Sequence, residues 1–202
     1  MAKKLLAIKK GKMKIVHPKS KFFIIGNADE QHSIAEKISE DDIVIRFNSP
    51  NPSCTLMADW VFIANGYNQI RHLKIDHQMF KPDTQVFFRH SRKDIYSCCY
   101  EKIPLHKRIK YCWRFPKWVK KSKLKQYKID LIPKSFYLQC VDMIGNSMPS
   151  TGLLAINYIL NKYPHNQIIL HNFTFKGWSG HSWNSEKNLI QIWISTGRLK
   201  IA

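Results

Sequence analysis

The chain has 202 residues, enough for one domain with a hydrophobic core and too few for two comfortable domains. It carries 33 Lys and Arg against 14 Asp and Glu, and the net charge of +19 attracts anions, whether nucleic acid, acidic lipid, nucleotide or phosphorylated glycan. No apolar run approaches the roughly 18 residues of a membrane span or suits a signal peptide, and the five cysteines lack zinc-site spacing. These features predict a globular protein of a reducing compartment, able to rest on an acidic membrane surface.

The predicted elements begin after a Lys-rich arm at residues 1–20. Short apolar runs that end in turn residues predict four buried strands, at residues 21–25, 42–48, 60–64 and 85–88. Between the first two strands, residues 29–40 suit a helix, because Ile34, Ala35 and Ile38 have helical spacing.

Residues 89–135 differ in composition from the rest of the chain. Lys and Arg are interleaved there with Tyr, Trp and Phe, and we interpret this stretch as a basic, mobile helical insertion. Rings and cations together also occur on nucleic-acid-binding surfaces. The plainer alternative is a solvated helical face whose rings enter the core.

The remaining elements resume the earlier pattern. A helix is predicted for residues 153–160, a strand for 167–171 and a short helix for 185–193. Strands that alternate with helices indicate an α/β fold, so residues 21–202 are predicted to form a single domain with a mainly parallel central sheet flanked by helices.

Three places combine a buried element with small or polar residues at its end. Gly26-Asn27 and Asn48-Ser49 each follow a strand, and residues 149–152, Pro-Ser-Thr-Gly, begin a helix. Ligands of open α/β sheets bind beyond the carboxyl ends of the strands, and a helix N-terminus suits a phosphate. Taken singly, each is better explained as a turn glycine or a helix cap.

Taken together and in order, these segments resemble the motifs of the animal-type sialyltransferases. Residues 23–27 and 41–48 resemble the large motif, residues 149–155 the small motif, and residues 181–190 the very small motif, a His followed five positions later by a Glu that begins a helix. The resemblance covers about residues 21–192. It implies a Rossmann-like, variant GT-A glycosyltransferase fold and places the basic insertion on the acceptor side.

The resemblance also implies roles for single residues. Asn27 and Asn48 would hold the phosphate and ribose of a CMP-linked donor, with Gly26 beside them. His181 would take the proton from the acceptor hydroxyl. Ser150, Thr151 and Gly152 would bind the nucleotide and the carboxylate side of the donor. Glu186 and Arg46 would support the motifs.

The chemistry of a CMP-sugar fits these residue types. Its monophosphate leaves easily through an oxocarbenium-like transition state, so the protein has to stabilise the phosphate and deprotonate the incoming hydroxyl, a task that suits histidine. The sequence contains no Asp-x-Asp, the metal clamp of many nucleotide-diphosphate sugar transferases. We therefore expect single displacement with inversion and no metal or other cofactor. His171, at a predicted strand end, is the nearest rival to His181.

Three departures from the animal-type pattern shape the expectation. The chain lacks the membrane anchor and the motif-joining disulfide, which indicates a bacterial-type cytoplasmic enzyme, peripheral at most at the inner face of the membrane. The family's third motif, an aromatic-flanked His that helps to bind phosphate, has no clear counterpart, and Lys176 or a basic residue of the insertion is a candidate substitute.

Several alternatives stay open at this point. Sialic acid and Kdo are both compatible donor sugars, and the expected acceptor is an acidic glycan or glycolipid such as lipooligosaccharide or capsule. A nucleic-acid-binding module would explain the charge but not the ordered motifs, so we expect no nucleic-acid partner. A non-catalytic nucleotide binder would not need His181 or Glu186.

Overall fold

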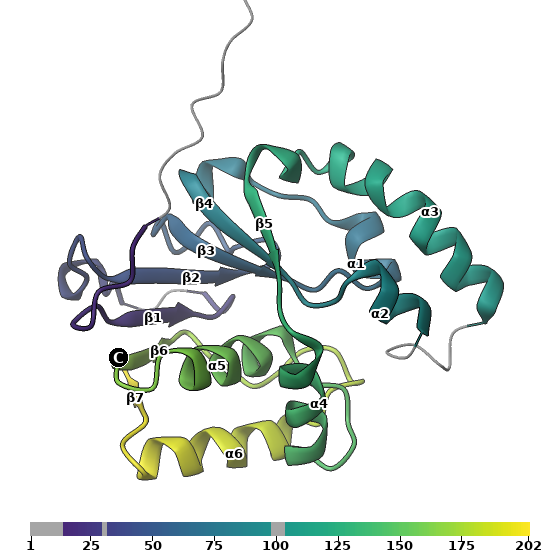
Figure 1. The fold of residues 1–202 in the computed structure, drawn as a ribbon. Coiled ribbons are helices and arrows are strands. Elements are labelled where there is room, and N and C mark those ends of the chain that lie inside the picture. The colour runs from purple at the N-terminus through teal and green to yellow at the C-terminus, as the bar shows by residue number, and fades with distance from the viewer. Residues whose placement is uncertain (1–13, 30–31, 98–103) are drawn as a thin grey trace, which may run out of the picture.

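The centre of the molecule is a seven-stranded sheet with the order β5-β4-β3-β2-β1-β6-β7, in which every neighbouring pair is parallel. It is seen in a computed structural model that describes residues 14–29, 32–97 and 104–202, drawn in Figure 1. Most of the predicted N-terminal arm, residues 1–13, lies outside the described residues. The architecture confirms the predicted single α/β domain with a parallel sheet and a Rossmann-like arrangement.

Five of the seven strands coincide with predicted ones. Continuous apolar runs mark them because both faces of a parallel sheet are covered by helices. The strands are β1 Phe22–Ile25, β2 Ile43–Phe47, β3 Ala58–Ile63, β4 Phe80–Phe88, β5 Lys128–Leu131, β6 Ile168–His171 and β7 Leu199–Ile201. The strands that the sequence pattern missed are the two at the edges, β5 and β7, which are short and partly exposed.

The helices cover both faces of this sheet. They are α1 Tyr67–His72, α2 Arg92–Ser97, α3 Leu105–Lys121, α4 Lys134–Met143, α5 Thr151–Lys162 and α6 Trp183–Ser195. Short 3-10 turns are η1 Ala35–Lys37, η2 His77–Met79 and η3 Leu124–Gln126. None of the helices in the described part of the chain is long and apolar enough to cross a membrane.

The helix predicted for residues 29–40 is wrong within the part that the structure describes, where only the turn η1 occurs. Side chains bind the backbone here in place of a helical ladder. Ser33 Oγ accepts a hydrogen bond from the Ala35 amide at 3.2 Å, and Asp42 accepts one from the Ser39 amide at 2.9 Å. Such local bonds compete with helix formation and favour turns.

The predicted insertion at residues 89–135 also needs correction. Its described residues include the helices α2 and α3, but they also include β5, which pairs with β4 and completes one edge of the sheet. The residues between β4 and β5 are therefore a long crossover connection between two parallel strands of the sheet.

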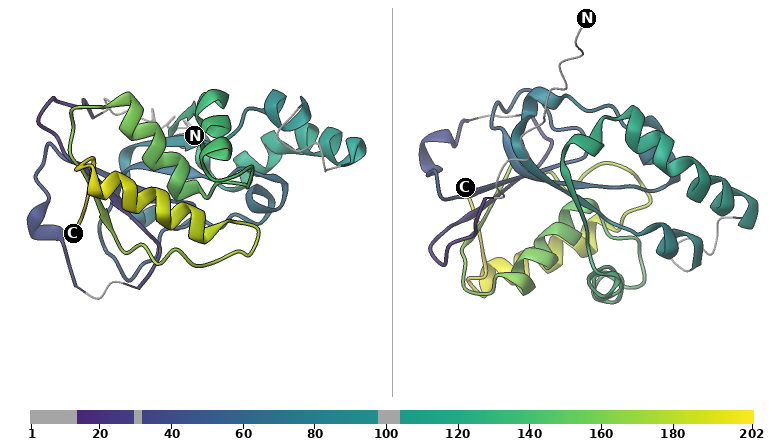
Figure 2. Two further views of the ribbon diagram at one scale, coloured as in Figure 1. Left: turned by 90° about the horizontal axis from the view of Figure 1, so that it is seen from below. Right: turned by 45° about the horizontal axis from the view of Figure 1, so that its top comes forward.

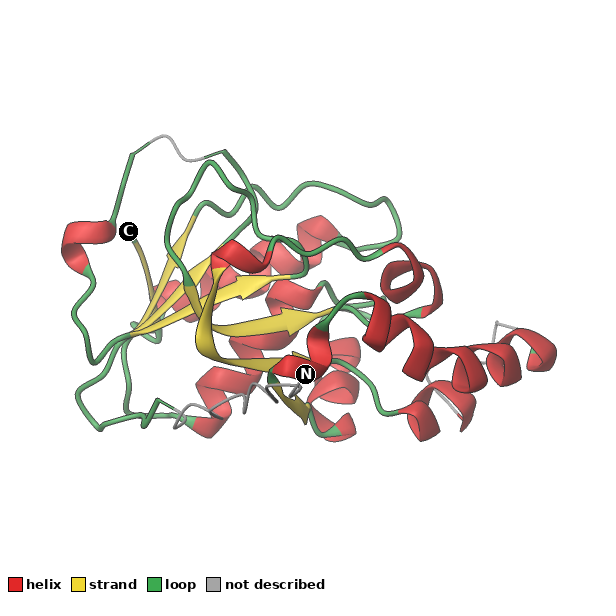
Figure 3. Cartoon of the chain, turned by 90° about the horizontal axis from the view of Figure 1, so that it is seen from above, coloured by secondary structure: helices red, strands yellow, loops and turns green. Residues whose placement is uncertain are grey.

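Alternate residues of the strands pack into hydrophobic cores on opposite faces of the sheet. Phe22 and Ile24 of β1 belong to the core under α4, α5 and α6, the face seen from below in Figure 2, whereas Phe23 and Ile25 pack on the opposite face. Farther along the sheet, Val61 and Val86 pack beneath α1, α2 and α3. The strand arrowheads in Figure 3 point toward the same end of the sheet, so the loops that follow the strands and carry the candidate site residues gather at that end.

Candidate active site

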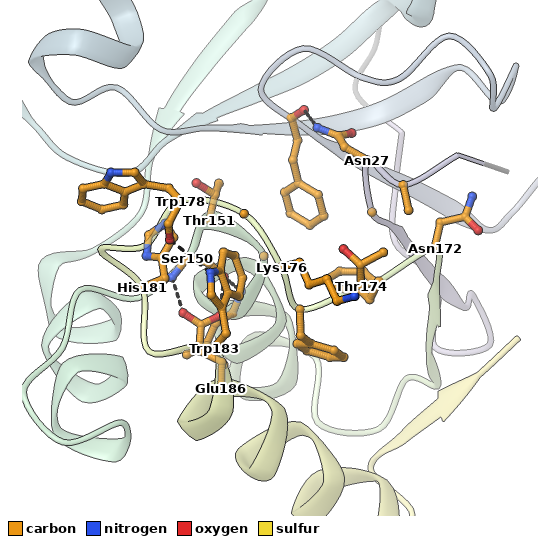
Figure 4. A pocket seen from close by; sticks show the side chains of 18 of the residues that line it. Asn27, Ser150, Thr151, Asn172, Thr174, Lys176, Trp178, His181, Trp183 and Glu186 are labelled. Carbon is orange, nitrogen blue, oxygen red and sulfur yellow. Dashed lines mark hydrogen bonds between the residues drawn. The ribbon is translucent and has the colours of Figure 1, made fainter.

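A cavity of about 350 Å³ lies at the carboxyl ends of β1, β2 and β6, beside the first turn of α5 (Figure 4). The loop after β6 and the start of α6 complete its wall. The structure brings together in this cavity all of the sequence-predicted site residues except Arg46: Gly26, Asn27, Asn48, Ser150, Thr151, Gly152, His181 and Glu186.

Gly26 allows the ends of β1 and β6 to approach each other. Ile25 is paired with His171, and the Gly26 amide donates to the His171 carbonyl at 2.8 Å. A Cβ on Gly26 would lie 2.1 Å from the backbone oxygen of Asn172, a distance that no side chain tolerates. Glycine is required here to bring the two strand ends together at the floor of the cavity.

Asn27 and Asn48 cross-link the ends of the neighbouring strands. Asn27 Nδ2 donates to the Phe47 carbonyl at 3.2 Å and to the Ser49 carbonyl at 3.4 Å, while Asn48 Oδ1 accepts from the Ala64 amide at 2.8 Å. Asn48 itself has a positive φ of 49°, a conformation that asparagine tolerates better than most residues. Among the described residues, Asn27 Oδ1 and Asn48 Nδ2 have no hydrogen-bond partner, so one acceptor and one donor are left for a ligand.

Ser150 caps α5 and is held by the buried carboxylate of Glu186. Ser150 Oγ accepts from the Leu153 amide at 3.1 Å and donates to Glu186 Oε2 at 2.6 Å, and the Ser150 amide donates to Glu186 Oε1 at 2.7 Å. The hydroxyl hydrogen of Ser150 is therefore committed to Glu186. Thr151 and Gly152 come next, and their amides have no partner among the described residues, which leaves two backbone donors at the start of a helix.

Glu186 is 2% exposed, and burial raises the pKa of its carboxyl above the ordinary value of 4.5. The two hydrogen bonds from Ser150 and the nearby His181 ring oppose that rise. Because Glu186 lies in the first turn of α6, its carboxylate joins the N-terminus of α6 to that of α5. This arrangement fits the predicted supporting role.

His181 is fixed by a backbone contact on one side of its ring. Its Nδ1 lies 2.8 Å from the Met148 carbonyl oxygen, an atom that can only accept, so Nδ1 carries a hydrogen. In the neutral ring, Nε2 then has the free electron pair. Trp178 and Trp183 stand edge-on to the imidazole, with centroid distances of 5.0 and 5.1 Å, and keep the ring in place. A histidine held in this tautomer can act as a general base.

The cavity also has a wall that motif comparison did not predict. Asn172, Thr174, Lys176 and Trp178 of the loop after β6 line it, as Figure 4 shows. The one sequence signal was the concentration of glycine and aromatic residues between residues 175 and 181. Lys176 brings a cation to the cavity, and its role in binding phosphate stays a prediction.

Arg46 and His171 lie outside this cavity. The Arg46 side chain is fully buried, and its guanidinium donates to the carbonyls of Asn51, Cys54 and Leu56 at 2.9 to 3.1 Å, so it holds the loop after β2. His171 is 3% exposed and packs edge-on against His32 beside a separate cavity of about 240 Å³.

Comparison with known proteins adds information on the fold. No family model and no curated protein matches the chain. Among solved structures, the chain resembles the sialyltransferase CstII from Campylobacter jejuni, determined in complex with the substrate analogue CMP-3FNeuAc, with a TM-score of 0.50 and 15% identity. The match covers 90% of this chain and 79% of that chain. At this identity the likeness shows a sialyltransferase-like fold.

Proposed function

We propose that the chain is an inverting, metal-independent glycosyltransferase that moves sialic acid or a related acidic sugar from a CMP-linked donor to a glycan hydroxyl. The observation that carries this proposal is the position of His181, held as a base by the Met148 carbonyl in the same cavity as the free amides of Thr151 and Gly152. A base and an anion site share one cavity, as the two halves of the reaction require.

The donor phosphate binds at the N-terminus of α5. The backbone amides of Thr151 and Gly152 and the side-chain Nδ2 of Asn48 donate to its oxygens, and Lys176 adds a positive charge. Asn27 presents an oxygen, so it accepts a hydrogen bond from a ribose hydroxyl. Ser150 and Glu186 contribute by fixing the helix start, because their own polar atoms bind each other.

Transfer follows from this placement in one displacement. The acceptor hydroxyl gives its proton to Nε2 of His181 while its oxygen forms a bond to the anomeric carbon. The bond from that carbon to the phosphate oxygen breaks, and its electron pair leaves with CMP, whose charge is stabilised by the α5 amides and Lys176. Attack from the side opposite the phosphate inverts the anomeric centre.

Two further observations support an acidic sugar on CMP. The motif order resembles that of the animal-type sialyltransferases. The structural neighbour CstII was determined with CMP-3FNeuAc, a CMP-linked analogue. We place the acceptor on lipooligosaccharide or capsule and the enzyme at the cytoplasmic side of the membrane, because the chain has a net charge of +19 and these acceptors are acidic.

A release assay tests the proposal. The protein is incubated with CMP-sialic acid or with CMP-Kdo, and free CMP is measured with and without lipooligosaccharide. Release that depends on both CMP-sialic acid and the acceptor supports sialic acid as the transferred sugar. Release only with CMP-Kdo identifies the other acidic sugar, and no release with either donor overturns the proposed activity.

A further inference from the structure

The helix α3 carries an unusual distribution of charge. Its sequence, LHKRIKYCWRFPKWVKK, contains no acidic residue from Leu105 to Lys121. None of the ion pairs formed by the described residues involves α3, since those pairs join Lys14 and Lys81 to Asp59, and Lys128 to Asp130. The exposed cations of α3 are its five lysines, Lys107, Lys110, Lys117, Lys120 and Lys121, whereas Arg108 and Arg114 are only partly exposed.

The outer face of α3 is divided into two strips. Leu105, Ile109 and Trp113 follow each other at intervals of one helical turn and are 51%, 51% and 75% exposed. Beside this apolar strip runs a basic strip with the spacing of a second helical row: Lys110, Arg114, Lys117 and Lys121. The opposite face, with Tyr111 and Val119, is buried against the sheet.

Apolar side chains next to a row of cations have a specific complement. An anionic bilayer accepts apolar side chains at its acyl boundary and cations at its phosphates, whereas water solvates only the cations. Tryptophan favours the membrane interface, and long Lys and Arg stems reach from there to the headgroups. At about 1.5 Å per residue, the 17 residues of α3 would lie along the surface rather than span it.

We propose that α3 docks the protein on an anionic membrane surface. Leu105, Ile109 and Trp113 enter the boundary between headgroups and acyl chains, and the basic strip binds the lipid phosphates. This assigns the docking surface to one helix face and goes beyond the general attraction expected from net charge.

Nucleic acid fits the same surface less well. Binding of single strands uses several stacking rings, but three of the four aromatic residues of α3 are turned inward: Tyr111, Phe115 and Trp118. The ring centroid of Tyr111 lies 5.4 Å from that of Phe115 and 5.7 Å from that of Trp118. Only Trp113 is left to stack, and a nucleic-acid surface gives no burial to Leu105 or Ile109.

The position of α3 suits a lipid-linked acceptor. Because α3 connects the parallel strands β4 and β5, its N-terminus lies on the side of the sheet where the strands have their carboxyl ends. Figure 1 shows this helix terminus projecting outward there. The cavity lies on this same side, at the carboxyl ends of β1, β2 and β6. Docking then brings the cavity toward acceptors in the membrane, a consequence that rests on the proposed function.

Vesicle flotation tests the proposal with the full chain. Wild type should bind phosphatidylcholine vesicles that contain phosphatidylglycerol and should leave pure phosphatidylcholine vesicles unbound. Ile109→Ser should weaken binding about tenfold, through lost apolar burial. Lys110→Gln combined with Lys117→Gln should weaken it about 25-fold, since each charge near an anionic surface contributes about a factor of five.

Matched controls lie on other elements. Ile192→Ser removes an isoleucine of α6 that is 57% exposed, and Lys162→Gln combined with Lys200→Gln removes two exposed charges away from α3; both should bind as wild type does. Melting temperatures should stay unchanged throughout, because every substituted side chain is exposed. No binding to anionic vesicles, or equal losses in α3 and control variants, would overturn the proposal, as would wild-type binding to duplex DNA but not to vesicles. Because flotation needs no donor, its result is independent of the release assay.

Discussion

At Gly26 the packing of the sheet leaves no space for a side chain. Gly26→Ala would put a Cβ 2.1 Å from the backbone oxygen of Asn172, and backbone cannot move aside as a flexible side chain can. We expect the free energy of unfolding to fall by about 1–3 kcal/mol, measured by urea denaturation.

Gly152→Ala is the matched control. Its Cβ would meet the ring of Phe173 at 3.0 Å, and this side chain can give way. The loss should be smaller, because alanine also favours the helix in which residue 152 lies. Equal stability of Gly26→Ala and wild type would show that the β1 and β6 ends are not so close.

Glu186 gives the stability a pH dependence of defined sign. Burial places its folded-state pKa above the ordinary value of 4.5, so the folded protein holds this proton more tightly than the unfolded chain does. The corresponding stability is present below pH 4.5 and is lost as pH rises through the folded pKa. Asp42, whose pKa is lowered from 3.8, acts in a separate window below that value.

Glu186→Gln isolates this contribution. The free energy of unfolding of wild type, minus that of the variant, should decrease as pH rises above 4.5. The measurement is denaturant unfolding of both proteins at a series of pH values. A difference that does not vary with pH would mean that the carboxyl is not shifted by burial.

Helix α5 is the element on which donor binding depends. Two amides at its start, those of Thr151 and Gly152, are available for one phosphate. The sequence contains no Asp-x-Asp motif, the metal clamp that many transferases use for a nucleotide diphosphate. Calorimetry in the presence of EDTA should show binding of CMP and weaker binding of UDP and GDP. Equal affinity for UDP, or binding only after a divalent cation is added, would contradict this account of the site.

The elements also show what a sequence can reveal. Buried strands such as β1 and β2 were predictable because both of their faces are covered, which forces continuous apolar runs. The edge strands β5 and β7 need no such run and were missed. The helix expected at residues 29–40 failed because the side chains of Ser33 and Asp42 bind backbone groups there, a contact that spacing alone does not reveal.

The candidate site was predictable to the extent that its residues belong to motifs. Gly26, Asn48, Ser150 and His181 come from segments far apart in sequence, and the structure places them in one cavity. Apart from Lys176, the wall formed by residues 172–178 could not be predicted, because it depends on the pairing of β6 beside β1. The actual role of Arg46 was equally hidden, since its partners are backbone carbonyls.

On the scale of the whole molecule, the excess of positive charge should appear in the kinetics. Attraction to an acidic, membrane-linked acceptor weakens as salt screens exposed charges, over a distance of about 10 Å at 0.1 M ionic strength. The acceptor KM should therefore rise steeply with salt, while kcat at saturating acceptor changes much less. A KM that is independent of salt would mean that the charge of +19 does not recruit the acceptor.

The most direct test of the account is the activity of His181→Ala, measured beside its affinity for CMP. The substitution removes the proposed base and leaves the amides of α5 and the side chain of Asn48 in place. Sugar transfer should fall by about 10²- to 10⁴-fold while the Kd for CMP stays near that of wild type. His165→Ala, at an exposed position in the turn before β6, should transfer at the normal rate. Transfer by His181→Ala at close to the wild-type rate would contradict the central claim that this histidine activates the acceptor.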